Sequence, residues 1–173
     1  MRKLNLRFLM IFVAGMFFIQ QASAQNLLLN PGFEDWNVNG AAGPPDNWEL
    51  TSGSMTAEQE ATIVYEGTYS AKITWTTSST VYLQQIDIPV TEGNNYEFTY
   101  WVFDNDPGGR ARVVVRWYDS GGGFVDGYYG DYSVDDPNWQ MLTTGSIQAP
   151  ATAVTAHTEM RVYDVSGWPG TAT

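Results

Sequence analysis

Two stretches in which apolar and polar residues alternate constrain this chain more than any other feature of its sequence. Tyr96–Phe103 and Arg110–Tyr118 both alternate with a period of two, which is the period of a β-strand. Pro107, Gly108 and Gly109 stand between them and are residues that turns favour. The simplest interpretation is a pair of neighbouring antiparallel strands joined by a turn.

The alternation divides the side chains of these two strands between two faces. One face is apolar and is predicted to be core: Tyr96, Phe98, Tyr100, Val102, Ala111, Val113, Val115 and Trp117. The other face combines a tryptophan with charged and hydroxyl-bearing residues: Glu97, Thr99, Trp101, Arg110, Arg112, Arg116 and Tyr118. A tryptophan among arginines on the solvent side of a sheet indicates a binding surface.

The rest of the chain also favours β-structure, because no helical period is sustained over a window of about 11 residues. Gly, Pro, Asn and Asp separate short candidate strands at intervals typical of an all-β sandwich or jelly roll. The expected strands are Asn26–Leu29, Trp48–Thr51, Thr56–Tyr65 with a break, Ser70–Thr76, Val81–Val90, Tyr96–Phe103, Arg110–Tyr118, Phe124–Tyr128, Trp139–Ile147 and Thr155–Val165. No repeat or linker divides residues 25–173, so we expect one domain.

Residues 1–24 have the three parts of a secretory signal peptide. Three basic residues precede an apolar run, Phe8–Ile19, and Ala22, Ser23 and Ala24 follow it. The run is too short to span a bilayer comfortably. We therefore expect cleavage near Ala24 and a soluble mature protein that is secreted to the medium, the periplasm or the cell surface.

The charge of the mature chain excludes two classes of partner. It has five basic residues against 19 acidic ones, a net charge of −14. Nucleic acid and anionic membranes both attract basic surfaces, so neither is an expected partner. Three of the five basic residues, Arg110, Arg112 and Arg116, lie within seven residues. The chain has no cysteine, so burial of a core or a bound metal must stabilise it without disulfides.

Five short motifs occur in order along the mature chain. They are Asn30-Pro31-Gly32-Phe33-Glu34, Pro45-Asp46-Asn47-Trp48, Glu66-Gly67-Thr68-Tyr69-Ser70-Ala71-Lys72-Ile73, Gln85 ahead of Gly93 and Tyr96, and Trp139. In order and spacing they resemble the galactose-binding-like jelly roll of secreted bacterial carbohydrate-binding modules of families four, nine and twenty-two. The resemblance covers almost all of residues 25–173 and implies a β-sandwich jelly roll that binds carbohydrate.

The resemblance also implies a structural calcium ion, held where two turns of such modules approach one another. Calcium takes carboxylate and carbonyl oxygens; Glu34 would supply its carboxylate, and Asn30 and Thr68 their carbonyls. The alternative is that Glu34 is an exposed acid of an ordinary turn. These modules close with a strand that carries a further Asp ligand, which has no counterpart before Thr173. The last strand is therefore expected to be missing, and the sequence to be a fragment or the first piece of a longer protein.

The predicted glycan site is the polar face that carries Trp101. An exposed indole is a flat platform for a pyranose, and the guanidinium groups of Arg112 and Arg116 bind hydroxyls or a uronate carboxylate. The complete predicted set is Glu97, Thr99, Trp101, Arg112, Arg116, Tyr118, Gln85, Arg161 and Tyr163. The competing interpretation pairs the arginines with Glu97 and Glu159 in a surface ion-pair network. Whether the ligand is acidic or neutral stays open.

Signs of catalysis are few. His157, the single histidine, is either a surface residue or a base beside a substrate, and the motifs of serine hydrolases, zinc proteases and phosphate loops do not occur. Tyr128, Tyr129 and Tyr132 form either a rim of the site or surface tyrosines of a turn. We predict a non-catalytic, monomeric module that binds polysaccharide and targets or anchors a larger extracellular protein. The alternatives are an adhesive spacer that binds no sugar, and a polysaccharide lyase or hydrolase.

Overall fold

The computed structural model describes residues 25–37, 43–51, 55–75 and 79–164. The predicted signal peptide and residues 165–173 lie outside these ranges. The regular elements described are all strands: β1 (Glu49–Leu50), β2 (Met55–Glu60), β3 (Ser70–Trp75), β4 (Val81–Pro89), β5 (Asn95–Tyr96), β6 (Thr99–Phe103), β7 (Gly109–Tyr118), β8 (Phe124–Tyr132), β9 (Trp139–Thr143), β10 (Ile147–Gln148) and β11 (Thr155–Asp164). Across these ranges there is no helix long and apolar enough to cross a membrane.

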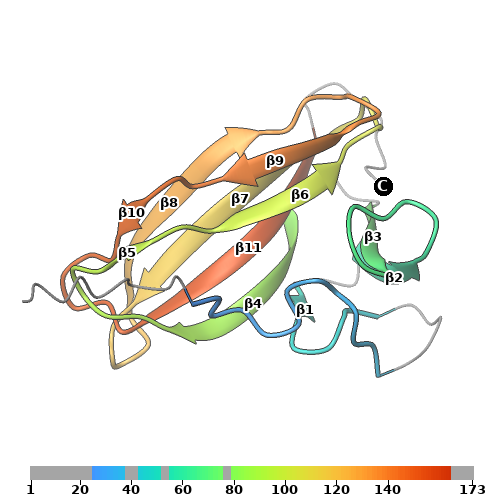
Figure 1. The fold of residues 1–173 in the computed structure, drawn as a ribbon. Helices are drawn as coiled ribbons and strands as arrows, with labels where there is room; N and C mark the ends of the chain where they lie inside the picture. The colour runs from blue at the N-terminus through green and yellow to red at the C-terminus, as the bar shows by residue number, and fades with distance from the viewer. Residues whose placement is uncertain (1–24, 38–42, 52–54, 76–78, 165–173) are drawn as a thin grey trace, which may run out of the picture.

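Five strands form one antiparallel sheet in the order β1-β4-β11-β7-β8. The other six make three antiparallel pairs, β6 with β9, β5 with β10, and β2 with β3. Figure 1 shows β5, β6, β9 and β10 as a second layer across the five-stranded sheet, with β2 and β3 beside it. The fold is an all-β sandwich, as the spacing of turns predicted.

The main core lies between the two layers. Alternate residues of β7 supply one side of it: Ala111, Val113, Val115 and Trp117. Phe98 and Leu142 of the second layer pack against them. A smaller cluster joins Trp48 to Trp75 and to buried residues of β2 and β4. Trp75 and Trp117, both predicted to be core, are 0% and 3% exposed.

The predicted pairing of Tyr96–Phe103 with Arg110–Tyr118 is wrong. β6 pairs with β9, while β7 lies between β8 and β11. Residues 104–108 therefore cross from one layer to the other. The assignment of faces still holds, because the apolar sides of both strands face the same core from opposite layers. Their polar sides consequently lie on opposite outer faces of the sandwich.

Other predicted strands differ at their boundaries. Asn26–Leu29 forms no strand, and its last residue bonds through its backbone to the side chain of Gln85. The predicted strand Trp139–Ile147 is divided into β9 and β10, because Gly145 has a positive φ of 59°. The strand that begins at Phe124 runs on to Tyr132.

Candidate functional site

The outer face of the five-stranded sheet carries aromatic and basic side chains from four of its strands. They alternate with core residues and lie opposite one another in register, so that Arg112 stands between Arg161 and Tyr132. We refer to this set as the arginine face: Tyr82, Arg112, Arg116, Tyr118, Phe124, Tyr129, Tyr132, His157, Glu159, Arg161 and Tyr163.

Each arginine of this face lies over aromatic rings. The distances from guanidinium carbon to ring centre are 4.6 Å for Arg112 and Tyr132, 5.1 Å for Arg112 and Tyr129, 4.9 Å for Arg116 and Phe124, and 5.1 Å for Arg161 and Tyr82. Such cation–π contacts contribute about 0.5–1 kcal/mol each at exposed sites. The rings and the guanidinium groups therefore hold one another in place.

A buried carboxylate, Glu159, joins two of these arginines. Its side chain is 1% exposed, it accepts a hydrogen bond from Nε of Arg161, and its Oε1 lies 3.9 Å from Nη1 of Arg116. Burial by itself would lower the pKa of Arg161, but the hydrogen bonds to Glu159 and to the Tyr163 hydroxyl outweigh burial and raise it. Arg161 is therefore charged at physiological pH and is fixed by Glu159.

The other two arginines keep hydrogen-bond donors for a ligand. Arg112 donates from Nε to the carbonyl of Gly130 at 2.6 Å and from Nη1 to the hydroxyl of Tyr132 at 3.1 Å. Within the described residues Arg116 makes no hydrogen bond from its guanidinium, and its side chain is 31% exposed. Since a guanidinium has five N–H groups, both retain unused ones.

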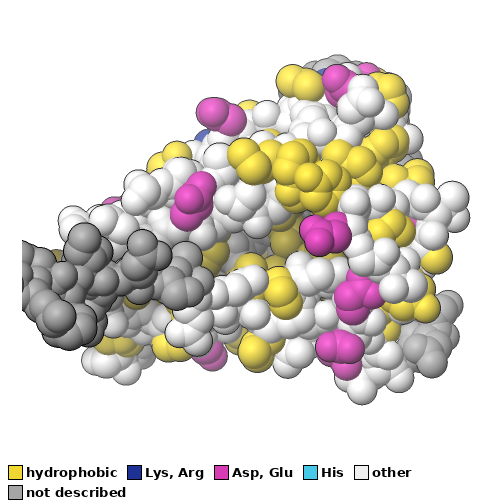
Figure 2. All heavy atoms as spheres, in the orientation of Figure 1, with side chains coloured by type: hydrophobic (Ala, Val, Ile, Leu, Met, Phe, Trp, Pro, Cys, Tyr) yellow, Lys and Arg dark blue, Asp and Glu magenta, His cyan; other side chains and the backbone are white. Residues whose placement is uncertain are grey.

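Trp101 points outward from the second layer, as the alternation along its strand predicted. Its ring stacks on that of Tyr65, with centres 4.1 Å apart and planes 16° apart, and Trp139 lies edge-on to Tyr65. We call Tyr65, Trp101, Phe103, Trp139 and Met141 the tryptophan patch. Figure 2 shows hydrophobic side chains gathered over this end of β6 and β9. Because Tyr65 covers one side of the indole, a ligand can reach the other side only.

The predicted glycan site is therefore divided between two faces. The residues that lie together on the arginine face are Arg112, Arg116, Tyr118, Arg161 and Tyr163. Trp101, Thr99 and Glu97 belong to the other side of the sandwich, where the Thr143 hydroxyl donates to the Glu97 carboxylate at 2.9 Å. The expectation that Trp101 and the arginines share a surface fails because it depended on the pairing of β6 with β7.

Gln85, also predicted to contact the ligand, is an interior residue. Its amide accepts the N–H of Leu29 at 2.8 Å and donates to the carbonyls of Leu29 and Asn47 at 2.9 and 3.1 Å. It thus fastens the N-terminal segment to β4. Conversely, Tyr82 and Phe124 belong to the arginine face but were not predicted. The sequence could have placed Tyr82 on this outer face, because Tyr82 lies between two apolar residues of an alternating strand. Phe124 gave no such indication, because it stands at the end of a strand.

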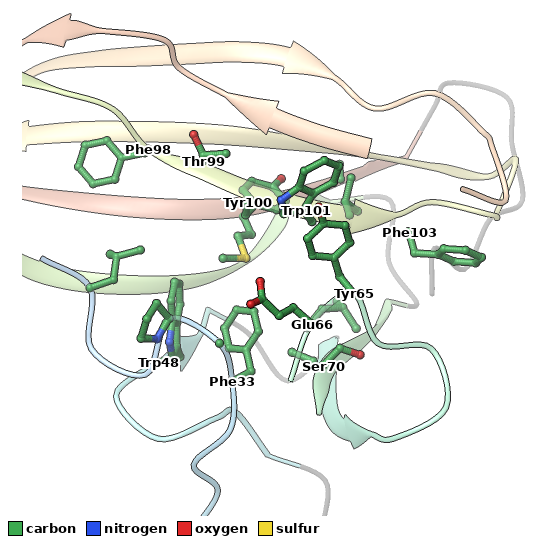
Figure 3. A pocket seen from close by; sticks show the side chains of 18 of the residues that line it. Phe33, Trp48, Tyr65, Glu66, Ser70, Phe98, Thr99, Tyr100, Trp101 and Phe103 are labelled. Carbon is green, nitrogen blue, oxygen red and sulfur yellow. The ribbon is translucent and has the colours of Figure 1, made fainter. Parts of the chain in front are cut away.

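A hollow of about 1300 Å³ opens between β3 and β6. Figure 3 shows Phe33 and Trp48 along one side of it, and Tyr65 and Trp101 along the other. In the part of the chain that the structure describes, β3 pairs only with β2 and β6 only with β9. The hollow therefore interrupts the second layer and separates the tryptophan patch from the turn that carries Glu34.

The two turns that the resemblance predicts to converge do meet, at Glu34. Its Oε1 accepts the backbone N–H groups of Thr68 at 2.8 Å and Tyr69 at 3.2 Å. These bonds, chiefly the one from Thr68, hold the pKa of the carboxyl below its usual value. Gly67 has a φ of 84°, and a Cβ there would lie 2.1 Å from Oε1, so this close approach requires glycine.

The predicted calcium ligands fit this geometry in part. Glu34 fits, because the hydrogen bond from the Thr68 N–H uses one carboxylate oxygen and leaves the other for a cation. This bond brings Thr68 beside Glu34 through its N–H group, whereas the predicted ligand was its carbonyl. Asn30 does not fit, because its carbonyl accepts the Nε1–H of Trp48 and the N–H of Phe33, both at 3.2 Å. The described residues contain no cluster of three or more acidic or histidine side chains. A cation here would therefore depend on backbone oxygens as well.

A β-sandwich with exposed rings and fixed donors on one outer sheet face has the construction of a binding module. Residues 25–155 match the carbohydrate binding domain of families 4 and 9, and the chain belongs to this family. No curated protein sequence matches the chain.

Solved structures of three kinds share the fold. The C-terminal family 22 carbohydrate binding module of Clostridium thermocellum Xyn10B has a TM-score of 0.54 at 16% identity, over 79% of this chain and 83% of that chain. TmCBM61, in complex with beta-1,4-galactotriose, has 0.54 at 16%, over 86% and 92%. The enzymatically active domain of bacteriophage CBA120 tailspike protein 4 has 0.57 at 15%, over 81% of this chain but 19% of that chain. At these identities the likeness shows the fold, and the family makes the chain a carbohydrate-binding module.

Proposed function

We propose that polysaccharide binds on the arginine face. The observation that carries the proposal is the exposure of its rings: Phe124, Tyr129 and Tyr132 are 54%, 47% and 50% exposed although each lies against a guanidinium. A flat exposed ring can take the C–H face of a pyranose, with a gain on the order of 1 kcal/mol, as for other aromatic contacts. The neighbouring guanidinium donors can then hydrogen-bond to the sugar.

The same face supports binding without catalysis. Glycoside hydrolysis uses two carboxyl groups on either side of the scissile bond, whereas Glu159, in the middle of this face, is buried and paired with arginine. His157 stacks against the ring of Tyr118, 4.1 Å between centres, and lies 3.5 Å from the Asp87 carboxylate. These two contacts fix the imidazole at the edge of the arginine face, which supports a structural role for His157.

The module is proposed to be secreted and to bring a larger extracellular protein to its polysaccharide. The support is the apolar segment ahead of Ala24 and the arrangement of similar proteins. One solved structure with this fold joins a family 22 module to the GH10 module of C. thermocellum xylanase 10B, with a TM-score of 0.54 and 14% identity over 75% of this chain and 28% of that chain.

Replacing Tyr129 with Ala is expected to weaken polysaccharide binding about threefold to tenfold, the range that one aromatic contact contributes. Tyr129 is suited to the test because the guanidinium groups of Arg112 and Arg161 lie 5.1 and 5.4 Å from its ring centre. Affinity gel electrophoresis with soluble xylan, galactan, mixed-linkage β-glucan and polygalacturonate measures binding as retardation.

Trp101→Ala is the matched control, because Trp101 is exposed to a similar extent, 40% against 47%, on the opposite outer face. This variant should be retarded like the unmodified protein. If Trp101→Ala loses retardation while Tyr129→Ala keeps it, the tryptophan patch is the site and the present assignment is wrong. If none of the polysaccharides retards the unmodified protein, the adhesive spacer becomes the better description.

We also propose that calcium stabilises the turn at Glu34. An ion that binds only the folded state adds RT ln(1 + [L]/Kd) to the free energy of unfolding, about 2.7 kcal/mol at a hundredfold excess over Kd. The melting temperature, followed by circular dichroism, is therefore expected to rise with added calcium and to fall in chelator. Glu34→Gln should remove this response.

The pH dependence of the melt separates calcium from the hydrogen bonds of Glu34. Because these bonds lower the pKa of the folded carboxyl, their contribution is present above the ordinary value of 4.5 and is lost as pH falls through the lower folded value. This loss should occur in chelator as well. If chelator does not change the melting temperature at pH 7, the calcium proposal is wrong. The stabilisation of the turn by the hydrogen bonds of Glu34 would not be affected by that result.

A further inference from the structure

We propose that the polysaccharide bound on the arginine face is acidic, a chain of uronate residues whose carboxylates pair with Arg112 and Arg116. This assigns a chemical class to the ligand of that face and so rests on the proposed function. Two features carry it, the sign of the charge on this face and the geometry of its two arginines with unused donors.

The arginine face is basic in a chain that is otherwise strongly acidic. Residues 25–173 contain five basic residues against 19 acidic ones. Three of the five, Arg112, Arg116 and Arg161, lie on this one face, in adjacent strands. Solubility of an acidic protein does not require its few cations to be gathered in one place. Their concentration beside exposed rings points to a ligand of opposite charge.

The carboxylates of the same face leave it positive. Glu159 lies against the Arg116 and Arg161 guanidinium groups and offsets one of the three positive charges of the face, which leaves two. Glu49 and Asp87 stand at the β1 and β4 side of the sheet, and β11 separates them from the arginines of β7. β8 carries two more acids: Asp126 lies opposite the core residue Trp117 in register, and Asp131 lies at the register shift between Tyr129 and Tyr132. The positive region is therefore the part of the face made by β7, beside the exposed rings of β8.

Arg112 and Arg116 have a spacing that suits a polymer. They are four residues apart on one face of β7, about 13 Å along the strand at 3.3 Å per residue. A guanidinium fork binds a carboxylate through two parallel hydrogen bonds, which gives geometric selectivity besides attraction. A chain that carries a carboxylate on successive sugars can engage both forks at once, whereas a single uronic acid can engage one. Polymer binding should therefore be much tighter than monomer binding.

The overall negative charge of the protein does not prevent such binding. At physiological ionic strength, charges farther apart than a Debye length of about 8 Å are largely screened. A polyanion lying against β7 therefore responds mainly to the arginines it touches. The same screening weakens the contacts themselves when salt is added, so the affinity is expected to fall from low to high ionic strength.

The competing interpretation is that the arginines only hold the rings and Glu159 in place. That role is evident for Arg161, which bonds both Glu159 and Tyr163. Arg116 distinguishes the two interpretations best, because its ion pair with Glu159 is long, 3.9 Å, and Arg161 still neutralises the carboxylate in its absence. Removing the Arg116 fork should thus change binding far more than folding.

Isothermal titration calorimetry of the mature domain provides the test, with polygalacturonate, galacturonic acid monomer, neutral xylan and dextran sulfate as ligands at 20 mM and 500 mM salt. Polygalacturonate is expected to bind most tightly, and less tightly in high salt. Arg116→Gln should weaken it about tenfold or more, the worth of a hydrogen bond to a charged group. Arg116→Lys, which keeps the charge but not the fork, should rescue only part of that loss.

Lys72→Gln is the matched control. It removes one positive charge from β3, where Lys72 forms an exposed pair with Glu58 at 3.9 Å, and should leave the affinity for polygalacturonate unchanged. Equal loss in Lys72→Gln and Arg116→Gln, or dextran sulfate bound as tightly as polygalacturonate, would mean non-specific attraction and overturn the inference. Binding of xylan but not of polygalacturonate would overturn it too and leave the proposed function intact. Binding of none of these polymers would count against both.

Discussion

Glu159→Ala is expected to lower the free energy of unfolding by about 3–5 kcal/mol, the usual cost of removing one partner from a buried ion pair. Glu159 is 1% exposed, and the Arg161 side chain to which it is bound is 14% exposed. Without the carboxylate, the Arg161 guanidinium remains largely buried and loses its counter-ion. Urea denaturation followed by tryptophan fluorescence measures the change.

The exposed pair Lys72–Glu58 is the control for this prediction. Its side chains are 43% and 50% exposed and its atoms are 3.9 Å apart, so Glu58→Ala should cost about 1 kcal/mol or less. Glu159→Met combined with Arg161→Met should recover most of the lost stability, because apolar side chains of similar size often replace a buried ion pair without cost. A loss below about 1 kcal/mol in Glu159→Ala would show that water solvates Arg161 and that Glu159 does not hold this face together.

Trp75→Ala is expected to cost about 3–5 kcal/mol, because it removes the largest fully buried side chain among the described residues and leaves a cavity. Trp75 packs in the smaller core with Trp48 and Leu83, and its Nε1 donates to the carbonyl of Ser79 at 3.1 Å. This cluster ties β3 to β4, so the variant should unfold at a clearly lower urea concentration.

Trp75→Phe separates the two contributions to this effect. It keeps most of the apolar burial and loses the hydrogen bond to Ser79, so the expected cost is about 1–2 kcal/mol. If Trp75→Ala and Trp75→Phe destabilise equally, the hydrogen bond dominates and the packing argument is wrong. If neither changes the midpoint, the contact between the β2–β3 pair and β4 contributes little to the cooperative fold.

The face on which each strand residue lies was readable from the sequence. Trp75 and Trp117 are buried and Trp101 is exposed, as their parity indicated, because alternation along a strand is a local property of the extended backbone. The same local reasoning placed His157, Arg161 and Tyr163 on an outer face. The converging turns around Glu34 were also predicted, but from resemblance to a family and not from periodicity.

The partners of the strands and the residues that share a site were decided by the tertiary structure. Two adjacent alternating strands fit a hairpin as well as they fit two facing layers, and only the pairing of β6 with β9 removes Trp101 from the arginines. Tyr82 and Tyr129 meet Arg161 from β4 and β8, strands far apart in the sequence. By the alternation along β11, Glu159 points to the outer face, yet it is buried because long side chains, such as Arg116 of the neighbouring strand, cover it. These contacts join residues from different strands, so no single stretch of sequence contains them.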